Sequence, residues 1–131
     1  MACMDAKGKI IIAAGSNVWQ HEMDTARALA GAGRTVEFVR RSEEKRTTSA
    51  DVLMDGELWE MKAPKSDKAR RVIRTLRDAL HQSRNVIFDS RRMSKVPDAQ
   101  IEHELRKGAR ELRSLRHLVF VNRKGKVIDI K

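Results

Sequence analysis

The pattern of hydrophobic and polar positions is most informative around Asp55-Gly56. Residues 50–54 and 57–62 form two short apolar-rich runs around this pair. An Asp-Gly pair between two such runs is a strong signal for a two-residue hairpin turn. We therefore predict two antiparallel strands in which Met54 lies opposite Glu57 and, counting outward from the turn, Asp51 lies opposite Glu60.

The rest of the chain predicts three helices and five further strands. Apolar spacing predicts helices over residues 16–32, 66–84 and 97–115, the first capped by Ser16 or Asn17 and stopped by Gly33. Strands are predicted over residues 9–14 (buried), 35–40, 85–89, 117–122 and 126–130, with loops over 41–49 and 91–96. Strand–helix–strand units favour parallel pairing with right-handed crossovers. The predicted fold class is α/β, a mixed β-sheet flanked by helices.

Composition limits the classes of protein that the chain can represent. A length of 131 residues suits one compact domain, and 40% hydrophobic with 35% charged residues suits a folded chain. We predict a single domain over 1–131, with residues 1–8 disordered or left over from the excision of a domain. The longest apolar run is far too short to span a membrane, and the single cysteine excludes an internal disulfide.

Charge adds a prediction about partners. The formal net charge is +10, and an excess of this size favours a polyanionic partner. Nucleic acid is the first candidate and an anionic membrane surface the second. The basic residues lie within predicted helices and loops rather than in a terminal tail, so we predict a folded nucleic-acid-binding surface and no membrane partner.

The predicted hairpin brings candidate chemistry together. Side chains alternate along a strand, so Asp51, Glu60 and Lys62 share one face. Two carboxylates directly opposite each other repel. A divalent cation would remove this repulsion, because Mg²⁺ prefers carboxylate oxygens. The lysine two residues beyond Glu60 would lie beside the metal, where it can hold a developing negative charge.

A simpler interpretation of the same face is that the hairpin lies at a sheet edge and the charges only meet water. In that case the opposite face, which carries Val52, Met54, Trp59 and Met61, is the buried one. Glu22 offers a similar choice, because it lies in the middle of the apolar face of the first helix. It either snorkels or pairs with an arginine, or it points across the sheet toward Asp51 and Glu60. The lysine spacing, the position of Glu22 and the basic charge together favour the metal site.

These residues resemble the pattern of the PD-(D/E)xK nuclease superfamily. Its core is a helix, a hairpin that bears Asp and then Glu-x-Lys, a second helix and a further strand. Here Asp51 and Glu60-Met61-Lys62 occupy the hairpin, and Glu22 lies where many members have a glutamate. Residues 51–64 and 82–92, with the basic helix between them, look like the C-terminal tRNase toxin domain of contact-dependent growth inhibition proteins. That resemblance covers roughly residues 18–130.

The resemblance implies a metal-dependent nuclease that cleaves tRNA as a bacterial toxin. Mg²⁺ or Mn²⁺ would be held by Asp51 and Glu60, with Glu22 acting through water, and Lys62 would orient the nucleophile or stabilise the phosphorane. It also implies an acidic immunity protein in the producing cell, delivery as part of a secreted protein, and action in the cytoplasm of a bacterium. The 131 residues contain no delivery segment, which leaves an excised toxin tip, a nuclease of a mobile element or a phage protein all open.

The predicted second helix supplies the basic surface. Residues 70, 74, 77 and 81 are basic and fall on one helical stripe opposite the apolar residues. We interpret the cations on and around this stripe as contacts to the phosphates of a nucleic acid. The alternative is that the stripe is an ordinary solvated helix face. The predicted nucleic-acid-binding residues are Lys65, Lys68, Arg70, Arg71, Arg74, Arg77, Gln82, Arg91 and Arg92. Gln82 either positions the nucleophile or caps the helix, and Asp89 is interpreted as a turn residue.

Two alternatives remain from the sequence. One is a DNA endonuclease of repair, recombination or a mobile element, because the spacing of the site residues does not separate RNA from DNA. The other is a nucleic-acid-binding module without catalysis. The module is disfavoured because Asp51 and Glu60 would repel the phosphates that it binds. Few aromatics and no tyrosine also argue against a base-stacking platform.

Overall fold

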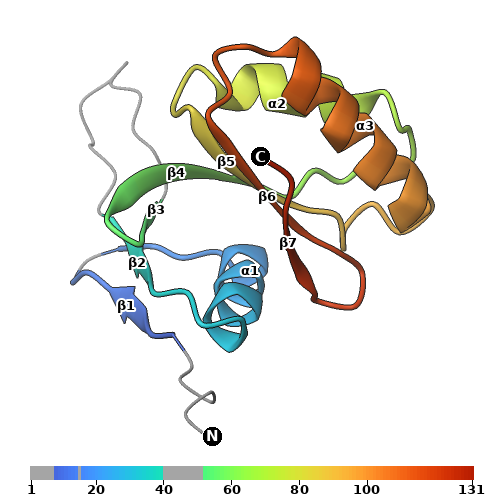
Figure 1. The fold of residues 1–131 in the computed structure, drawn as a ribbon. Helices are drawn as coiled ribbons and strands as arrows, with labels where there is room; N and C mark the ends of the chain where they lie inside the picture. Colours follow the sequence, from blue (N-terminus) through green and yellow to red (C-terminus); the bar gives the residue numbers. More distant parts are fainter. Residues whose placement is uncertain (1–7, 15, 40–51) are drawn as a thin grey trace, which may run out of the picture.

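The computed structural model describes residues 8–14, 16–39 and 52–131, and in this part of the chain three helices flank a seven-stranded mixed sheet (Figure 1). The predicted fold class, an α/β fold with a mixed sheet flanked by helices, is confirmed. The strands follow one another across the sheet in chain order. Their bounds are β1 Ile10–Ile12, β2 Val36–Phe38, β3 Val52–Met54, β4 Glu57–Lys62, β5 Asn85–Asp89, β6 His117–Val121 and β7 Val127–Asp129. The helices are α1 Gln20–Gly31, α2 Arg71–Ala79 and α3 Asp98–Glu111.

The connections follow from the strand directions. β1 and β2 pair in parallel through α1, and β4, β5 and β6 pair in parallel through α2 and α3. The remaining neighbours pair antiparallel. The sheet curls so that α1 lies on one side and α2 with α3 on the other (Figure 1). The carboxyl ends of β4, β5 and β6 therefore meet at one edge, which is where ligands bind in open α/β sheets.

The central hairpin has the predicted register. Val52 pairs with Trp59, Leu53 with Leu58 and Met54 with Glu57. Asp55 and Gly56 both have positive φ, 52° and 86°, which is the backbone of a type I′ turn. The predicted pairing of Asp51 with Glu60 lies outside the described residues.

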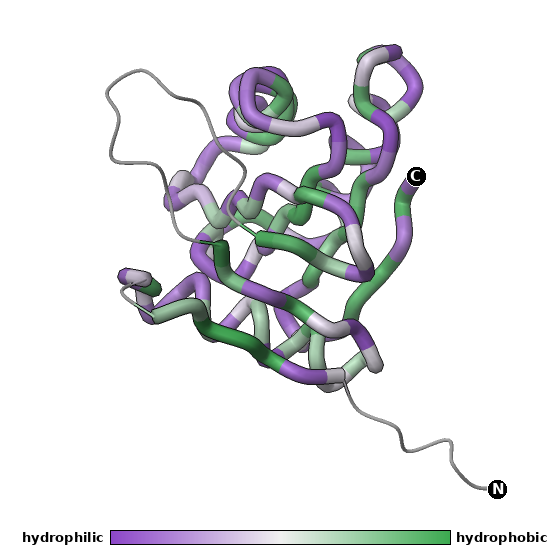
Figure 2. The backbone as a smooth tube through the Cα atoms, turned by 90° about the vertical axis from the view of Figure 1, so that its left-hand side faces the viewer, coloured by the Kyte–Doolittle hydropathy of each residue, from purple (hydrophilic) through white to green (hydrophobic). Residues whose placement is uncertain are grey.

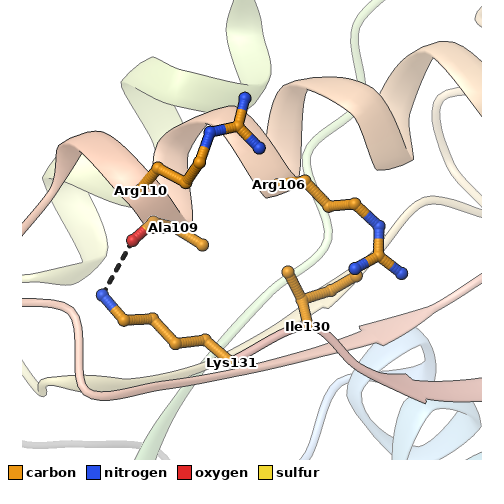
Figure 3. A pocket seen from close by; sticks show the side chains of 5 residues that line it. All are labelled: Arg106, Ala109, Arg110, Ile130 and Lys131. Atoms are coloured by element: carbon orange, nitrogen blue, oxygen red, sulfur yellow. Dashed lines mark hydrogen bonds between the residues drawn. The ribbon is translucent and has the colours of Figure 1, made fainter.

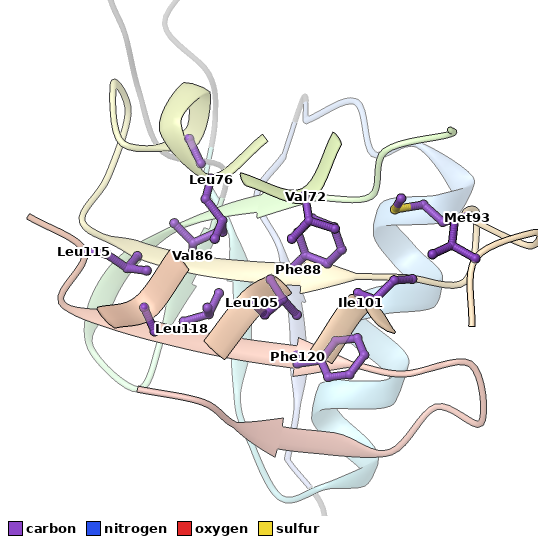
Figure 4. Close-up of a cluster of buried hydrophobic side chains, with 13 residues drawn as sticks. Val72, Leu76, Val86, Phe88, Met93, Ile101, Leu105, Leu115, Leu118 and Phe120 are labelled. Carbon is purple, nitrogen blue, oxygen red and sulfur yellow. The ribbon is translucent and has the colours of Figure 1, made fainter. Parts of the chain in front are cut away.

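Two apolar clusters sandwich the sheet. The first lies between the sheet and the α2–α3 layer, and Figure 4 shows its side chains, among them Phe88 and Phe120 of the sheet and Leu76, Leu105 and Ile101 of the helices. The second packs Ala26 and Leu29 of α1 against the other face of the sheet. In Figure 2 the strands of the sheet are largely hydrophobic, whereas many of the connections are hydrophilic.

The faces of β4 are set by this sandwich. Trp59 and Met61 belong to the cluster under α1, and both are 6% exposed. Alternation then assigns Glu60 and Lys62 to the face that bears α2, in line with their register partners Val86 and Phe88, which belong to the other cluster. The interpretation that the hairpin lies at a sheet edge is therefore wrong, because β4 is a central strand and Glu60 is 5% exposed.

The first helix begins later than predicted, at Gln20 rather than near Ser16. Trp19, the residue before the helix, is extended, and its N–H donates a hydrogen bond to the Glu22 carboxylate (3.0 Å). This bond caps the helix, so that it begins at the next residue. The stop at Gly33 is confirmed. Its φ is +93°, and the N–H of Arg34 donates to the Leu29 carbonyl in a Schellman motif.

Three further predictions of local structure need correction. The second helix covers only Arg71–Ala79 of the predicted 66–84, because side-chain hydrogen bonds at both ends compete with helix formation. Lys68 N–H donates to Ser66 Oγ (3.1 Å), and Ser83 Oγ donates to the Leu58 carbonyl (2.9 Å). The third helix ends at Glu111 rather than at residue 115. The strand at residues 10–12 is not buried, because it is an edge strand in which the second and third residues are 43% and 47% exposed.

Close packing of α2 against α3 depends on Gly108. A Cβ atom at this position would meet Leu76 Cδ1 at 2.7 Å and Ile73 Cδ1 at 3.0 Å. A side chain at this position would force Leu76 and Ile73 of α2 to shift, so the glycine allows the two helices to pack closely. This packing positions the N-terminal end of α2 beside the last residues of β4.

Candidate functional site

Glu60 and Lys62 form an ion pair at the carboxyl end of β4. Lys62 Nζ lies 3.3 Å from Glu60 Oε2, with the glutamate side chain 6% and the lysine side chain 30% exposed. A nearly buried carboxylate and a partly exposed ammonium on one face of a central strand match the predicted acid and cation. The third predicted member, Asp51, lies outside the described residues.

One of the two predicted metal ligands lies within the described residues. Glu60 supplies a buried carboxylate, which is the kind of donor a hard divalent cation takes. Among residues 8–14, 16–39 and 52–131, no group of three His, Cys, Asp or Glu side chains converges in a way that would hold a metal ion. A site built on Glu60 would need Asp51.

Glu22 has a local role in the structure. It is 6% exposed, and its Oε1 atom accepts the N–H of Trp19, three residues earlier. The carboxylate thus serves the N-terminus of α1, where a negative charge also meets the positive end of the helix dipole. A role toward Asp51 and Glu60 stays a prediction.

Two adjoining cavities open at the edge where β4 and β5 end. The first, of about 250 Å³, is lined by His21, Asp24, Ala63, Asp89, Arg91 and Arg92. The second, of about 230 Å³, is lined by His21, Met61, Lys62, Ala63, Pro64, Arg71, Thr75 and Asp78. His21 and Ala63 line both, so the two cavities form neighbouring parts of one polar depression between α1 and α2.

Arg91 in the first cavity is held by Asp89. Asp89 is 3% exposed and accepts hydrogen bonds from Thr25 Oγ1 (2.6 Å), Arg91 N (2.9 Å) and Arg91 Nη2 (2.7 Å). The hydrogen bonds from Arg91 to the Asp89 carboxylate raise the pKa of its guanidinium. The bond to the Arg91 N–H closes a turn, so the interpretation of Asp89 as a turn residue is confirmed.

The other predicted contact residues lie mainly at the surface. Arg92 is exposed, and its Nη1 donates to the Ala63 carbonyl (3.0 Å), which places it at the rim of the first cavity. Arg71 lines the second cavity with Lys62. Gln82 is half-buried in the turn after α2, beyond the last residue of that helix. The other residues of the predicted contact set, Lys65, Lys68, Arg70, Arg74 and Arg77, are all exposed.

A third cavity, of about 300 Å³, lies away from this edge, between α3 and the residues after β7 (Figure 3). Its cations are largely engaged within the protein. Lys131 Nζ donates to the Ala109 carbonyl (2.7 Å), and Arg106 Nη2 lies 2.9 Å from Glu102 Oε2. No described acidic residue lines it, so it lacks the acid–cation pair of the β4 edge.

Sequence reasoning missed three residues at the cavities. His21 lines both cavities, although no ligand or catalytic spacing in the sequence marks it. Thr75 is 5% exposed, lines the second cavity, and its hydroxyl has no hydrogen-bond partner within the described part of the chain. Asp24 lines the first. No pattern in the neighbouring sequence marks these residues as part of a site, because the cavities form between elements that are distant in sequence.

Comparison with known proteins defines the class. A family profile described as the contact-dependent growth inhibition CdiA C-terminal domain matches residues 48–127, more than half of the chain. The chain therefore belongs to this family and is a bacterial toxin domain. None of the curated proteins with which it was compared matches it. No helix within the described ranges has the length and apolar character needed to cross a bilayer.

A solved structure shows the same fold. The chain is similar to one in a CdiA-CT/CdiI toxin and immunity complex from Burkholderia pseudomallei, with a TM-score of 0.72 and 18% sequence identity. The superposition covers 95% of this chain and 99% of the other. At this identity the likeness establishes the fold, and the chemistry must be argued from the residues of this chain.

Proposed function

We propose that this toxin domain is a metal-dependent endonuclease of the PD-(D/E)xK type that cleaves RNA, with tRNA as the substrate. The observation that carries the proposal is the Glu60–Lys62 pair. It lies on a central strand, on the face that bears α2, and Lys62 lines a cavity that it shares with Arg71. A pair of this kind at the carboxyl ends of parallel strands suits a reaction at an anionic centre.

The proposed ligands of Mg²⁺ or Mn²⁺ are Glu60 and Asp51. When bound, the metal would supply Lewis-acid polarisation of the scissile phosphate. Burial of Glu60 suits this role, because a carboxylate at 5% exposure is held in a fixed place. Glu22 is proposed to contact the metal ion through a water molecule.

Lys62 is proposed to act on the reacting phosphate. Its ammonium lies 3.3 Å from Glu60 and is 30% exposed, so it can reach a group in the second cavity while staying oriented by the carboxylate. A fixed cation there stabilises the charge that develops on the phosphorane or orients the nucleophile. Arg71 on the same cavity would neutralise a neighbouring phosphate.

The exposed cations around this edge would bind the rest of the backbone. Arg70, Arg74 and Arg77 lie on or next to α2 and are exposed, as are Lys65 and Lys68 before it. Phosphate contacts of this kind give affinity that falls with salt and carry no sequence information. The net charge of +10 supports the same conclusion.

An immunity protein is a proposed partner. The structurally similar chain is part of a toxin and immunity complex, and a partner for this chain should carry acidic groups that cover the basic surface or fill the cavities. We further propose that the domain is delivered as part of a secreted protein and acts in the cytoplasm of the target bacterium.

The experiment that tests the function is cleavage of total tRNA and of plasmid DNA by the purified domain. Mg²⁺, Mn²⁺ and EDTA are compared, with Glu60→Gln as the inactive variant and Glu57→Gln as its control on the same strand. Metal-dependent loss of tRNA that only Glu60→Gln abolishes supports the proposal. Cleavage of DNA alone would assign a DNA endonuclease instead, and binding of both without cleavage would overturn the enzymatic assignment.

A further inference from the structure

Trp19 is the largest exposed apolar side chain near the candidate site. It is 63% exposed, directly before the first residue of α1. The other tryptophan, Trp59, is 6% exposed and donates its indole N–H to the Met54 carbonyl (3.2 Å). Trp59 therefore has a role in the core, whereas the exposure of Trp19 contributes nothing to the burial of apolar surface.

The Trp19 ring lies beside a residue that lines both cavities. The centroids of the Trp19 and His21 rings are 6.4 Å apart and their planes differ by 25°, which is an offset stack. His21 lines the first cavity with Arg91 and the second with Lys62. The indole is therefore one ring contact away from the residue that the two cavities share.

The charges of the depression suit a phosphodiester chain. Arg91, Arg92, Lys62 and Arg71 supply cations along its length. Of its three carboxylates, Asp89 is bound to Arg91 and Thr25, and Asp24 accepts a hydrogen bond from Gln20 (2.9 Å) and lies 3.7 Å from Arg27. Asp78 lines the second cavity near Lys62 and Arg71. Phosphates bound to these cations would lie beside His21, whose ring stacks with that of Trp19.

The low aromatic content of the sequence argued against a base-stacking platform. We propose that Trp19 and His21 nevertheless form a platform that stacks with one unpaired nucleobase next to the bound phosphates. This inference rests on the proposed function and names how the substrate is recognised. A stacking face accepts every base because each has a π-face. It requires a base that is free of its helix, so the platform favours single-stranded loops and ends over duplex.

Because the Trp19 side chain is exposed, its replacement leaves the fold unchanged, and circular dichroism of Trp19→Ala and Trp19→Phe checks this. Affinity is measured by fluorescence anisotropy with a labelled single-stranded oligoribonucleotide in EDTA, which prevents metal-dependent cleavage. Trp19→Ala should bind about 10- to 100-fold more weakly, as for loss of one stacked base. Trp19→Phe should keep most of the affinity, and Leu58→Ala, which removes another exposed apolar side chain (51%), should keep all of it.

Tryptophan fluorescence gives a second readout that does not depend on catalysis. Stacking on an RNA base should quench the exposed indole of the wild type, and inorganic polyphosphate, which has no bases, should not. In Trp19→Phe only Trp59 remains, so RNA should cause little quenching. Equal quenching by polyphosphate, or wild-type affinity of Trp19→Ala, overturns the platform.

The two proposals fail in different ways. Cleavage of tRNA with unchanged binding by Trp19→Ala would leave the nuclease intact and remove the platform. Quenching and a selective loss in Trp19→Ala without any metal-dependent cleavage would keep the platform and remove the nuclease. Absence of any nucleic-acid binding would overturn both.

Discussion

Two acid–cation pairs lie at the same edge of the sheet on adjacent strands. In each the acid and the cation are two residues apart, Glu60 with Lys62 on β4 and Asp89 with Arg91 after β5. Their side-chain exposures are nearly equal, 6% and 30% in the first pair and 4% and 30% in the second. Burial therefore does not distinguish them.

The difference lies in the bonds. Arg91 binds Asp89 through Nε and Nη2 and through its backbone N–H, and Thr25 adds a hydroxyl bond at 2.6 Å. Lys62 approaches Glu60 through one ammonium at 3.3 Å. A planar guanidinium held at several points is fixed, whereas an ammonium on a flexible stem can reorient toward a substrate. The Asp89–Arg91 pair therefore suits a structural role, and the Glu60–Lys62 pair suits a catalytic role.

Removal of the β4 cation should have the largest effect, and on activity. Lys62→Ala should lower tRNA cleavage by about 10²- to 10³-fold, the usual cost of losing one group that stabilises transition-state charge. Stability should fall less than it does in Asp89→Ala, because Lys62 makes a single 3.3 Å contact with Glu60. Cleavage rates and urea unfolding are measured together, with Lys107→Ala as the control at an exposed lysine of α3 that lines neither cavity of this edge. A large loss of stability with unchanged cleavage would show that the Glu60–Lys62 pair is structural and not catalytic.

Removal of the β5 acid should instead act on stability. Asp89→Ala leaves the Arg91 guanidinium and the Thr25 hydroxyl without their acceptor, so the free energy of unfolding should fall by about 3 kcal/mol. Urea denaturation measures this change. Asp129→Ala, which removes a 65% exposed partner of Arg34, should cost less than about 1 kcal/mol. Equal losses in the two variants would show that the buried Asp89 network contributes no more to the free energy of unfolding than an exposed ion pair does.

Exchange of the two cations sharpens the comparison further. Arg91→Lys keeps the charge but loses the two-point contact, so the free energy of unfolding should fall by roughly 1.5 kcal/mol. Lys62→Arg should leave stability unchanged and reduce cleavage, because a planar fork does not reproduce the point charge of an ammonium. The same two assays apply. A destabilised Lys62→Arg with full activity would contradict the assignment.

The smallest effect is expected at the exposed stripe of α2. Arg74→Ala combined with Arg77→Ala should weaken RNA binding modestly and lower the slope of log affinity against log salt by about 1 for each phosphate that the variant no longer neutralises. Titrations at several salt concentrations measure the slope. Arg113→Ala with Arg116→Ala, at two arginines beyond α3, serves as the matched control. An unchanged slope in the α2 variant would mean that the stripe is only solvated.

The sequence by itself determined the features that depend on neighbouring residues. Asp55-Gly56 defined the hairpin and its register, because a type I′ turn requires two residues that accept positive φ. Gly33 ended α1 for the same kind of reason. Apolar runs located the strands 85–89 and 117–121, which lie in the core. The Glu-x-Lys spacing placed Glu60 and Lys62 on one face.

Only the tertiary structure decided which residues meet at the edge of the sheet. Thr25 and Asp89 are 64 positions apart yet share a 2.6 Å hydrogen bond. His21 reaches the end of β4 because α1 packs against the curled sheet, and the Trp19 ring lies 6.4 Å from the His21 ring. No local pattern encodes such contacts, since they depend on how curvature and helix packing bring distant elements together.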